Sequence, residues 1–281
     1  MRMITDITEM RELALSWRAQ GCSIGFVPTM GYLHRGHLSL MEAARAENDY
    51  VVVSIFVNPA QFGPNEDFAR YPRDLSADTA LAESVHADVL FCPAAADIYP
   101  PGFATYVEPL ELSGRLCGKS RPGHFRGVCT VVLKLFNIVR PSRAYFGQKD
   151  AQQFIILRRM TDDLNLDIEM KSLPIVRERD GLALSSRNVY LTEMERQQAV
   201  ALSRALNRAG GLFGAGERQT VALRAALAEE LGRAPLGRID YVEIVDTVNL
   251  QPLETVDNAA LIALAVFFGK TRLIDNIILE G

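Results

Sequence analysis

The run "YVVVSIFV", residues 50–57, decides the fold. Its unbroken series of β-branched and apolar residues predicts a strand buried on both faces, as in a parallel sheet covered by helices on each side. A second apolar run, "SIGFVPT" (23–29), precedes it, and residues 36–47 between the two carry apolar side chains at helical spacing. Together the three segments predict a strand–helix–strand unit with a right-handed crossover.

The same alternation extends along most of the chain. A helix over residues 6–20 begins at Asp6, and Glu9 three residues later predicts a capping box. Further strands and helices are predicted at "DVLFCP" (88–93), "AYFG" (144–147), "DIEMKSLPI" (167–175), 76–86, 127–139 and 150–164. This order predicts an α/β fold with a doubly wound, Rossmann-like parallel sheet, in which ligands bind at the carboxyl ends of the strands.

The last hundred residues show another pattern. A long helix is predicted from Thr192, where Glu195 completes a capping box, and a second over 220–231. Three strands follow without helices between them, at 239–246, 258–268 and 272–279, which predicts antiparallel pairing. We therefore expect a Rossmann-like nucleotide-binding domain over residues 1–175 and a smaller C-terminal α+β domain over residues 176–281 that closes over the site.

Composition limits the function. Hydrophobic residues make up 48% and charged residues 23% of the 281 residues, which is typical of a soluble globular protein. The net charge of −4 argues against a broad nucleic-acid surface. We expect no secretory signal, no membrane span and no membrane partner. The four cysteines form no CxxC pair, which predicts reduced thiols and a cytoplasmic location.

The stretch "HRGH" (34–37) holds two of the four histidines, at the predicted junction of a strand and its helix. Three residues apart on a first helical turn, His34 and His37 face the same way, and the N–H groups of a helix start favour phosphate. Gly36 lets a ligand approach the backbone closely. The pair could therefore stabilise negative charge that develops on a phosphate. The alternative is a turn and a helix cap, which by itself explains the position of the histidines and leaves their spacing unexplained.

Other polar segments could complete a phosphate site. "LSSRN" (184–188) offers two hydroxyls and a guanidinium as a clamp, or it is a polar loop made of turn-forming residues. "FGQKD" (146–150) places Lys149 near the carboxyl edge of the sheet, and its Asp150 either caps the next helix or accepts from a ribose hydroxyl. "RPGHFRGV" (121–128) is either a second anion site or a solvated basic loop.

A long polar loop over residues 57–74 follows the buried strand, and loops of this length are often functional. Its Asn58 and Gln61, with Gln153 from the segment after Lys149, could bind a small polar substrate through neutral amides; the alternative for each is a solvated side chain. Gly63 and Pro64 make this loop our candidate for a lid that excludes water.

An early H-x-G-H followed by a distant Ser-Ser-Arg loop resembles the HxGH nucleotidyltransferase superfamily. Within it, the chain is similar to the pantoate–β-alanine ligases, over essentially its whole length. The segments that match, in order and at family spacing, are "FVPTMGYLHRGH", "FVNPAQFGPNEDFARYPRD", "RPGHFRGV", "FGQKDAQQ", "VRERDGLALSSRN", "IDYVEIVD" and "GKTRLIDN".

The resemblance implies an AMP-forming ligase that condenses (R)-pantoate with β-alanine to pantothenate, a precursor of coenzyme A. The pantoate carboxylate would attack the α-phosphorus of ATP, giving pantoyl adenylate and pyrophosphate, and the β-alanine amine would then displace AMP. A homodimer is implied as well. Mg²⁺ would be held chiefly by ATP oxygens and water, because no acidic cluster stands out in the sequence.

Carried over residue by residue, the resemblance assigns catalysis to His34, His37 (the proton donor), Lys149 and Arg187. Gln61 and Gln153 would hold pantoate, with Asn58 as a further substrate-binding residue. The ATP-binding residues would be Met30, Gly31, Tyr32, Leu33, His34, Arg35, Gly36, His37, Gly147, Gln148, Lys149, Asp150, Val176, Leu184, Ser185, Ser186 and Arg187.

Three rival functions are less well supported. An adenylyltransferase of the same superfamily that acts on a phosphorylated acceptor would need more cations, whereas Gln61 and Gln153 are neutral. An aminoacyl-tRNA synthetase conflicts with the acidic charge and with the lack of an anticodon-binding extension. A non-catalytic nucleotide-binding module conflicts with the presence of the four predicted catalytic residues.

Overall fold

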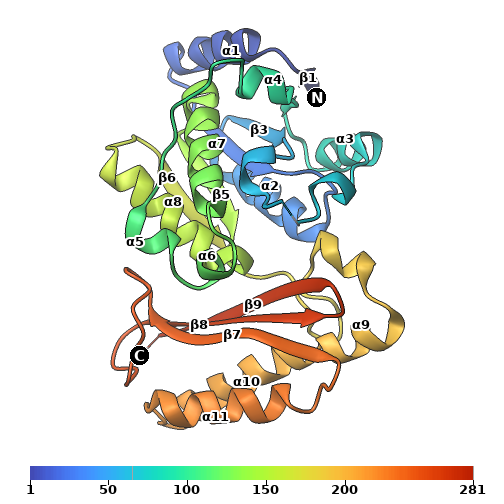
Figure 1. The fold of residues 1–281 in the computed structure, drawn as a ribbon. Coiled ribbons are helices and arrows are strands. Elements are labelled where there is room, and N and C mark those ends of the chain that lie inside the picture. Colours follow the sequence, from blue (N-terminus) through green and yellow to red (C-terminus); the bar gives the residue numbers. More distant parts are fainter. Residues whose placement is uncertain (65, 281) are drawn as a thin grey trace.

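The computed structural model describes residues 1–64 and 66–280, and its first half forms a six-stranded parallel sheet with strand order β1-β4-β3-β2-β5-β6 (Figure 1). The strands are β1 (Arg2–Ile4), β2 (Ile24–Thr29), β3 (Tyr50–Ile55), β4 (Val89–Phe91), β5 (Arg143–Gly147) and β6 (Glu169–Leu173). The expected doubly wound α/β fold is confirmed. Strand β1 was not predicted, because three residues are too few to show a period of their own.

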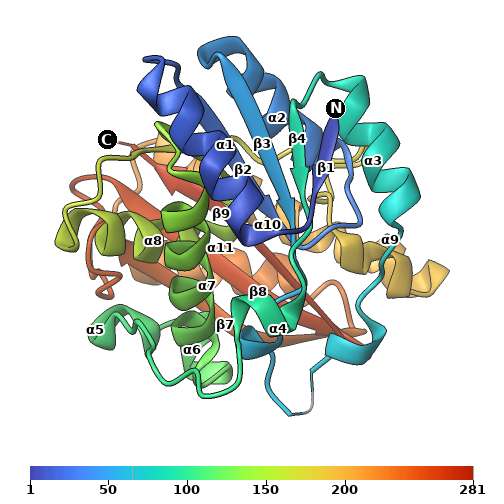
Figure 2. The same ribbon diagram turned by 90° about the horizontal axis from the view of Figure 1, so that it is seen from above.

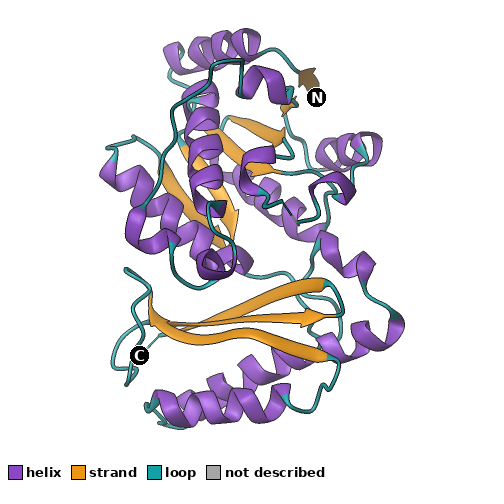
Figure 3. Ribbon diagram, viewed as in Figure 1, coloured by secondary structure: helices purple, strands orange, loops and turns teal. Residues whose placement is uncertain are grey.

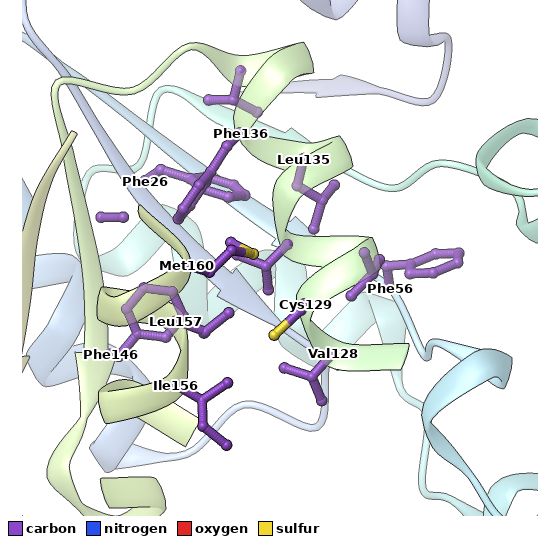
Figure 4. Close-up of a cluster of buried hydrophobic side chains, with 14 of the residues drawn as sticks. Phe26, Phe56, Val128, Cys129, Leu135, Phe136, Phe146, Ile156, Leu157 and Met160 are labelled. Carbon is purple, nitrogen blue, oxygen red and sulfur yellow. The ribbon is translucent and has the colours of Figure 1, made fainter. Parts of the chain in front are cut away.

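Helices cover both faces of this sheet, which explains the apolar run in β3. Val52 faces α1 (Ile7–Ala19), α7 (His124–Val139) and α8 (Ala151–Asp163), whereas Val51 and Val53 face α2 (Arg35–Glu47) and α3 (Leu75–Ser84). Figure 4 shows the first of these clusters, in which Phe26 and Phe136 pack close to Met160. Each fully buried side chain of this kind stabilises the fold by about 1.5–3 kcal/mol.

Strands β1, β4 and β3 lie side by side in the parallel sheet (Figure 2). Several short elements connect the main helices and strands. The short elements are α4 (Ala95–Ile98), α5 (Leu110–Ser113), α6 (Cys117–Ser120) and the 3₁₀ turns η1 (Pro59–Gln61), η2 (Phe68–Arg70), η3 (Gln148–Asp150) and η4 (Ser186–Tyr190).

Of the capping box predicted for α1, one of the two hydrogen bonds is present. Asp6 accepts from the Glu9 N–H at 2.7 Å, but the Glu9 carboxylate pairs with Arg2 at 2.6 Å instead of returning to the backbone.

The C-terminal part is an antiparallel sheet in the order β7-β8-β9, packed on helices (Figure 3). Its elements are α9 (Glu193–Ala199), α10 (Ala201–Gly214), α11 (Thr220–Leu231), β7 (Gly237–Asp246), β8 (Ala260–Phe268) and β9 (Thr271–Leu279). The capping box of Thr192 and Glu195 is confirmed, although the helix predicted from Thr192 is divided at Val200.

The antiparallel sheet lies between α10 and α11 on one side and the parallel-sheet part on the other (Figure 1). The core around α7 and α8 includes Val245 and Leu261 from the C-terminal strands, so the two parts share apolar packing. The division into domains at residues 175 and 176 stays a prediction.

All four cysteines are free. In the part of the chain that the structure describes, no helix is both long and apolar enough to cross a bilayer.

Candidate active site

The H-x-G-H stretch begins where β2 leaves the sheet. Residues 30–33 form a tight turn in which Gly31 and Tyr32 have φ angles of +82° and +52°. A side chain at Gly31 would place its Cβ 2.9 Å from the Asp78 carboxylate, so the turn needs glycine there. The carboxylate of Asp78, which reaches over from α3, accepts from the N–H groups of Tyr32 and Leu33 at 2.9 and 2.6 Å. Asp78 therefore holds the turn in place.

Sequence reasoning missed Asp78. It lies 45 residues from Leu33, on the first turn of an ordinary helix, where an acidic side chain is expected in any case. The only unusual property is its burial, since Asp78 is 2% exposed. No local pattern marks it.

The side chains of both histidines cap the start of α2. His34 is the N-cap; its Nδ1 accepts from the Gly36 N–H at 3.2 Å, while the Nδ1 of His37 accepts from the His34 N–H at 3.2 Å. The expectation that capping explains only their position is wrong, because a capping box requires this three-residue spacing. Since both Nδ1 atoms accept, each neutral ring carries its proton on Nε2.

Electrostatics keep both imidazoles neutral. Burial, reinforced by the positive charge of Lys149, lowers the pKa of His34 to about 4. Burial also holds the pKa of His37 well below its ordinary value, with His34 and Lys149 adding to the effect. At neutral pH the pair therefore presents two uncharged N–H donors.

The four predicted catalytic residues converge. His34, His37, Lys149 and Arg187 all line one cavity of about 210 Å³. Its wall also includes Met30, Gly36, Asn58, Gln61, Gly147, Asp150, Gln153, Val176, Leu184, Ser185 and Ser186. Lys149 comes from η3 at the end of β5 and Arg187 from η4, so the cavity lies at the carboxyl ends of the strands, as predicted.

Five predicted ATP-site residues do not line this cavity. Gly31 and Tyr32 form the turn, and Leu33 is buried beneath it. The exposed guanidinium of Arg35 pairs with Glu42. The side chain of Gln148 donates to the Asn276 Oδ1 at 3.3 Å. Their roles in binding ATP stay predictions.

The amides of the 58–74 loop are buried, so the alternative of solvated side chains is wrong for both. Asn58 is 1% exposed; its Nδ2 donates to the Gln61 Oε1 and the Gly127 carbonyl, both at 3.1 Å, and its Oδ1 accepts from the Tyr99 hydroxyl at 2.8 Å. Asn58 thus has little capacity left for a substrate and positions Gln61. The Gln61 Nε2 faces the Met30 sulfur at 3.0 Å, a weak partner that a substrate oxygen can replace.

In the segment 121–128, Arg121 and His124 belong to a partly buried hydrogen-bond network, so the solvated-loop alternative is wrong for these two residues; the second anion site stays a prediction. Arg121 makes two hydrogen bonds of 2.6 Å with Glu66 and donates to the Nε2 of His124 at 2.9 Å. The Nδ1–H of His124 must then donate to the Gln61 carbonyl, 2.8 Å away. Burial, with the charge of Arg121, lowers the pKa of His124 to about 4. The network fixes the backbone of Gln61, and Glu66 already neutralises Arg121.

A larger cavity of about 670 Å³ opens between the two parts of the chain. It shares five wall residues with the smaller one, namely Lys149, Asp150, Gln153, Ser185 and Arg187, and extends to Tyr241, Lys270 and Arg272. Together the two spaces are of the size that binds cofactor-sized ligands. Asp150 makes no capping hydrogen bond to α8, which leaves its carboxylate near Lys149, at 3.8 Å.

Strand β9 of the C-terminal sheet contacts the backbone of the turn that carries Lys149. Asn276 on β9 is buried, and its Nδ2 donates to the carbonyls of Gln148 and Lys149, each at 2.9 Å. The neighbouring Asp275 pairs with Arg177 at 2.6 Å. The turn that carries Lys149 is therefore held by a strand from the other half of the chain. Among residues 1–64 and 66–280, no three His, Cys, Asp or Glu side chains are grouped so that they could hold a metal ion.

A doubly wound sheet, an H-x-G-H helix start and a Ser-Ser-Arg loop around one cavity define a nucleotide-binding protein of the HxGH class. The comparisons with known proteins are more specific. The chain matches the family model described as pantoate-beta-alanine ligase over residues 2–278, and it belongs to this family.

Relatives and solved structures agree. The chain is 60% identical to the pantothenate synthetase of Thermotoga neapolitana, covering 99% of this chain and 100% of that one, and 58% identical to that of Fervidobacterium nodosum, covering both completely. The crystal structure of the Thermus thermophilus enzyme matches with a TM-score of 0.93, at 48% identity over 99% of each chain. The Francisella tularensis ligase, solved with β,γ-ATP and β-alanine, has a TM-score of 0.82 at 38% identity over 99% of this chain and 97% of its own.

The predicted family and enzyme class are thus confirmed. The protein is an ATP-dependent ligase that joins pantoate to β-alanine to form pantothenate. This finding favours the ligase over the adenylyltransferase of a phosphorylated acceptor, the tRNA synthetase and the non-catalytic module.

Proposed function

We propose that the ligase works through pantoyl adenylate formed where His34, His37, Lys149 and Arg187 meet. The observation that carries the proposal is the convergence of these four side chains, from three separate segments, on one cavity. The pantoate carboxylate attacks the α-phosphorus of ATP and pyrophosphate leaves. The β-alanine amine then attacks the acyl carbon, and AMP leaves with the bonding electrons of the acyl–phosphate bond.

The charges suit this reaction. A carboxylate that approaches a triphosphate meets like charge, so the phosphates must be neutralised first. Lys149 and Arg187 supply the cations, and the Nε2–H groups of His34 and His37 donate to the phosphate oxygens as negative charge develops. The resemblance names His37 as the proton donor; because its ring is neutral, we propose that it donates its Nε2–H as a hydrogen bond and keeps the proton. We propose that Mg²⁺ is held by ATP oxygens and water, where it would neutralise further phosphate charge.

Neutral amides suit the other substrate. Gln61 and Gln153 line the same cavity and can bind the hydroxyl and carboxylate ends of pantoate, with Gln61 also close to the incoming β-alanine. Val176 would bind the adenine through its backbone. Its carbonyl already accepts from the Leu184 N–H at 3.0 Å, so its N–H is the better placed donor for a ring nitrogen.

Two measurements test the proposal. Purified protein supplied with ATP, pantoate and β-alanine should yield pantothenate and AMP by mass spectrometry. In the absence of β-alanine, exchange of labelled pyrophosphate into ATP should require pantoate, because the adenylate forms in the first step. Exchange without pantoate, or only when β-alanine is present, would contradict the adenylate route.

A closing loop is a further proposal. An adenylate hydrolyses readily, so the site must exclude water during the reaction. The 58–74 loop is our candidate, and it already touches the Ser-Ser-Arg loop, since the Tyr71 hydroxyl lies 3.3 Å from the Ser186 hydroxyl. ATP plus pantoate should protect this loop from limited proteolysis; equal cleavage with and without the ligands would count against a lid.

The homodimer and the cytoplasmic location also stay predictions. Analytical ultracentrifugation would test whether the protein is a dimer.

A further inference from the structure

The arginine assigned to the triphosphate already has a partner. Its Nε and Nη2 atoms donate to the two carboxylate oxygens of Asp67, at 3.0 and 3.1 Å. Asp67 immediately precedes η2 in the 58–74 loop, 120 residues from Arg187 in the sequence. The two side chains of Arg187 and Asp67 are 28% and 17% exposed, so water screens the pair only in part.

The geometry of the pair leaves one edge of the guanidinium unused by Asp67. A guanidinium carries five N–H groups, and the carboxylate takes the Nε–H and one hydrogen of Nη2. The second hydrogen of Nη2 and the neighbouring hydrogen of Nη1 form the end of the guanidinium, which is itself a two-pronged fork suited to a phosphate; the remaining Nη1 hydrogen points back toward Cδ. The guanidinium carbon also lies over the Tyr71 ring, 5.9 Å from the ring centre.

The pair is also part of a wider contact between the two loops. The hydroxyl of Tyr71 meets Ser186, and the Tyr190 hydroxyl donates to the carbonyl of Arg70 at 2.9 Å. Burial opposes ionisation of Asp67, but the hydrogen bonds and charge of Arg187 outweigh it and lower the pKa of the carboxyl below its usual value. At neutral pH the two loops are therefore joined through a charged carboxylate.

We propose that Asp67 is a positioning residue of the ligase, which holds one edge of Arg187 so that the other edge faces the phosphates of ATP. The inference rests on the function proposed for Arg187. It opposes a simple alternative, in which Asp67 occupies Arg187 only until ATP displaces it. The two hypotheses predict opposite effects of removing the carboxylate. Removing a positioning carboxylate lowers kcat/KM for ATP, whereas removing a competitor strengthens ATP binding.

A double-mutant cycle tests the proposal. Asp67→Asn, Arg187→Ala and the double variant are compared by pantoate-dependent pyrophosphate exchange at varied ATP, with ATP affinity measured by calorimetry. We expect Asp67→Asn to lower kcat/KM for ATP about tenfold and to have no further effect once Arg187 is removed. Asp67→Glu, which keeps the charge on a longer arm, should recover part of the loss.

A matched control separates positioning from general destabilisation. Glu243→Gln breaks an arginine–carboxylate pair of similar length, between Glu243 on β7 and Arg224 on α11 at 3.0 Å, and should leave exchange unchanged. An equal loss with Asp67→Asn in both backgrounds, no loss, or tighter ATP binding would each overturn the proposal. If Arg187→Ala itself keeps full exchange, the function proposed for Arg187 fails and the inference fails with it. If Arg187→Ala is impaired and Asp67→Asn is not, only the inference fails.

Discussion

The substitution Asp78→Asn tests whether a buried carboxylate outside the cavity sets up the nucleotide site. Each carboxylate oxygen of Asp78 accepts one backbone N–H, from Tyr32 and from Leu33. Asparagine keeps the size and one oxygen, but it turns the second oxygen into an NH₂ group that faces a backbone donor. The turn before His34 then loses one of its two attachments to α3.

The magnitude follows from these contacts. A hydrogen bond to a charged group contributes about 1.5–3 kcal/mol. Holding Tyr32 at a positive φ costs about 1–3 kcal/mol, which the two hydrogen bonds offset. Losing one bond should disfavour the observed turn by about 2 kcal/mol, a factor of about 30 in the ratio of formed to unformed turn. Because the turn leads directly into His34, we expect kcat/KM for ATP to fall, by at most about this factor.

The assay is steady-state formation of pantothenate at varied ATP, with thermal unfolding of the same samples. Asp74→Asn on the same helix is the matched control. Asp74 caps α3 by accepting from the Ala77 N–H at 3.0 Å, and asparagine caps helices equally well, so this variant should behave as wild type. An Asp78→Asn enzyme with an unchanged kcat/KM for ATP would refute the reasoning.

Three further predictions concern the site and its support. His37→Ala should lower pantoate-dependent pyrophosphate exchange about 100-fold or more, because a donor to the reacting phosphate is lost; exchange at the wild-type rate would remove His37 from the mechanism. Asn276→Ala leaves the carbonyls of Gln148 and Lys149 without their buried donor, and we expect a lower melting temperature together with a higher KM for ATP. Acid should destabilise the protein: His34 and His124 have folded-state pKa values of about 4, below the 6.5 of an unfolded histidine, so the unfolded state binds more protons between pH 6.5 and 4. Each histidine then lowers the free energy of unfolding by up to about 1.4 kcal/mol for every pH unit that the pH falls within that window. Urea unfolding at pH 7 and pH 5 measures the slope, which should be shallower in His124→Asn.

The sequence alone was sufficient for the architecture and for most of the cavity wall. The parallel sheet could be predicted because burial on both faces leaves a local mark, the apolar run of β3, and helices leave a period of their own. The residues of the cavity were predicted from the motifs, from the rule that parallel strands bring their carboxyl ends to one edge, and, for residues such as Val176, from the resemblance to the ligase family. His34, His37 and Lys149 follow the ends of β2 and β5 and meet there because of that rule, whereas Arg187 reaches the cavity from η4.

Only the tertiary structure decided how those residues are held. Asp78, Asp67 and Asn276 contact their partners across 45, 120 and 127 residues. Periodicity reports which face of an element is buried, but it does not report which distant side chain satisfies a given backbone or guanidinium group. The same limit applies to Asn58, whose buried amide already bonds to Gln61, Gly127 and Tyr99, which no local pattern indicates.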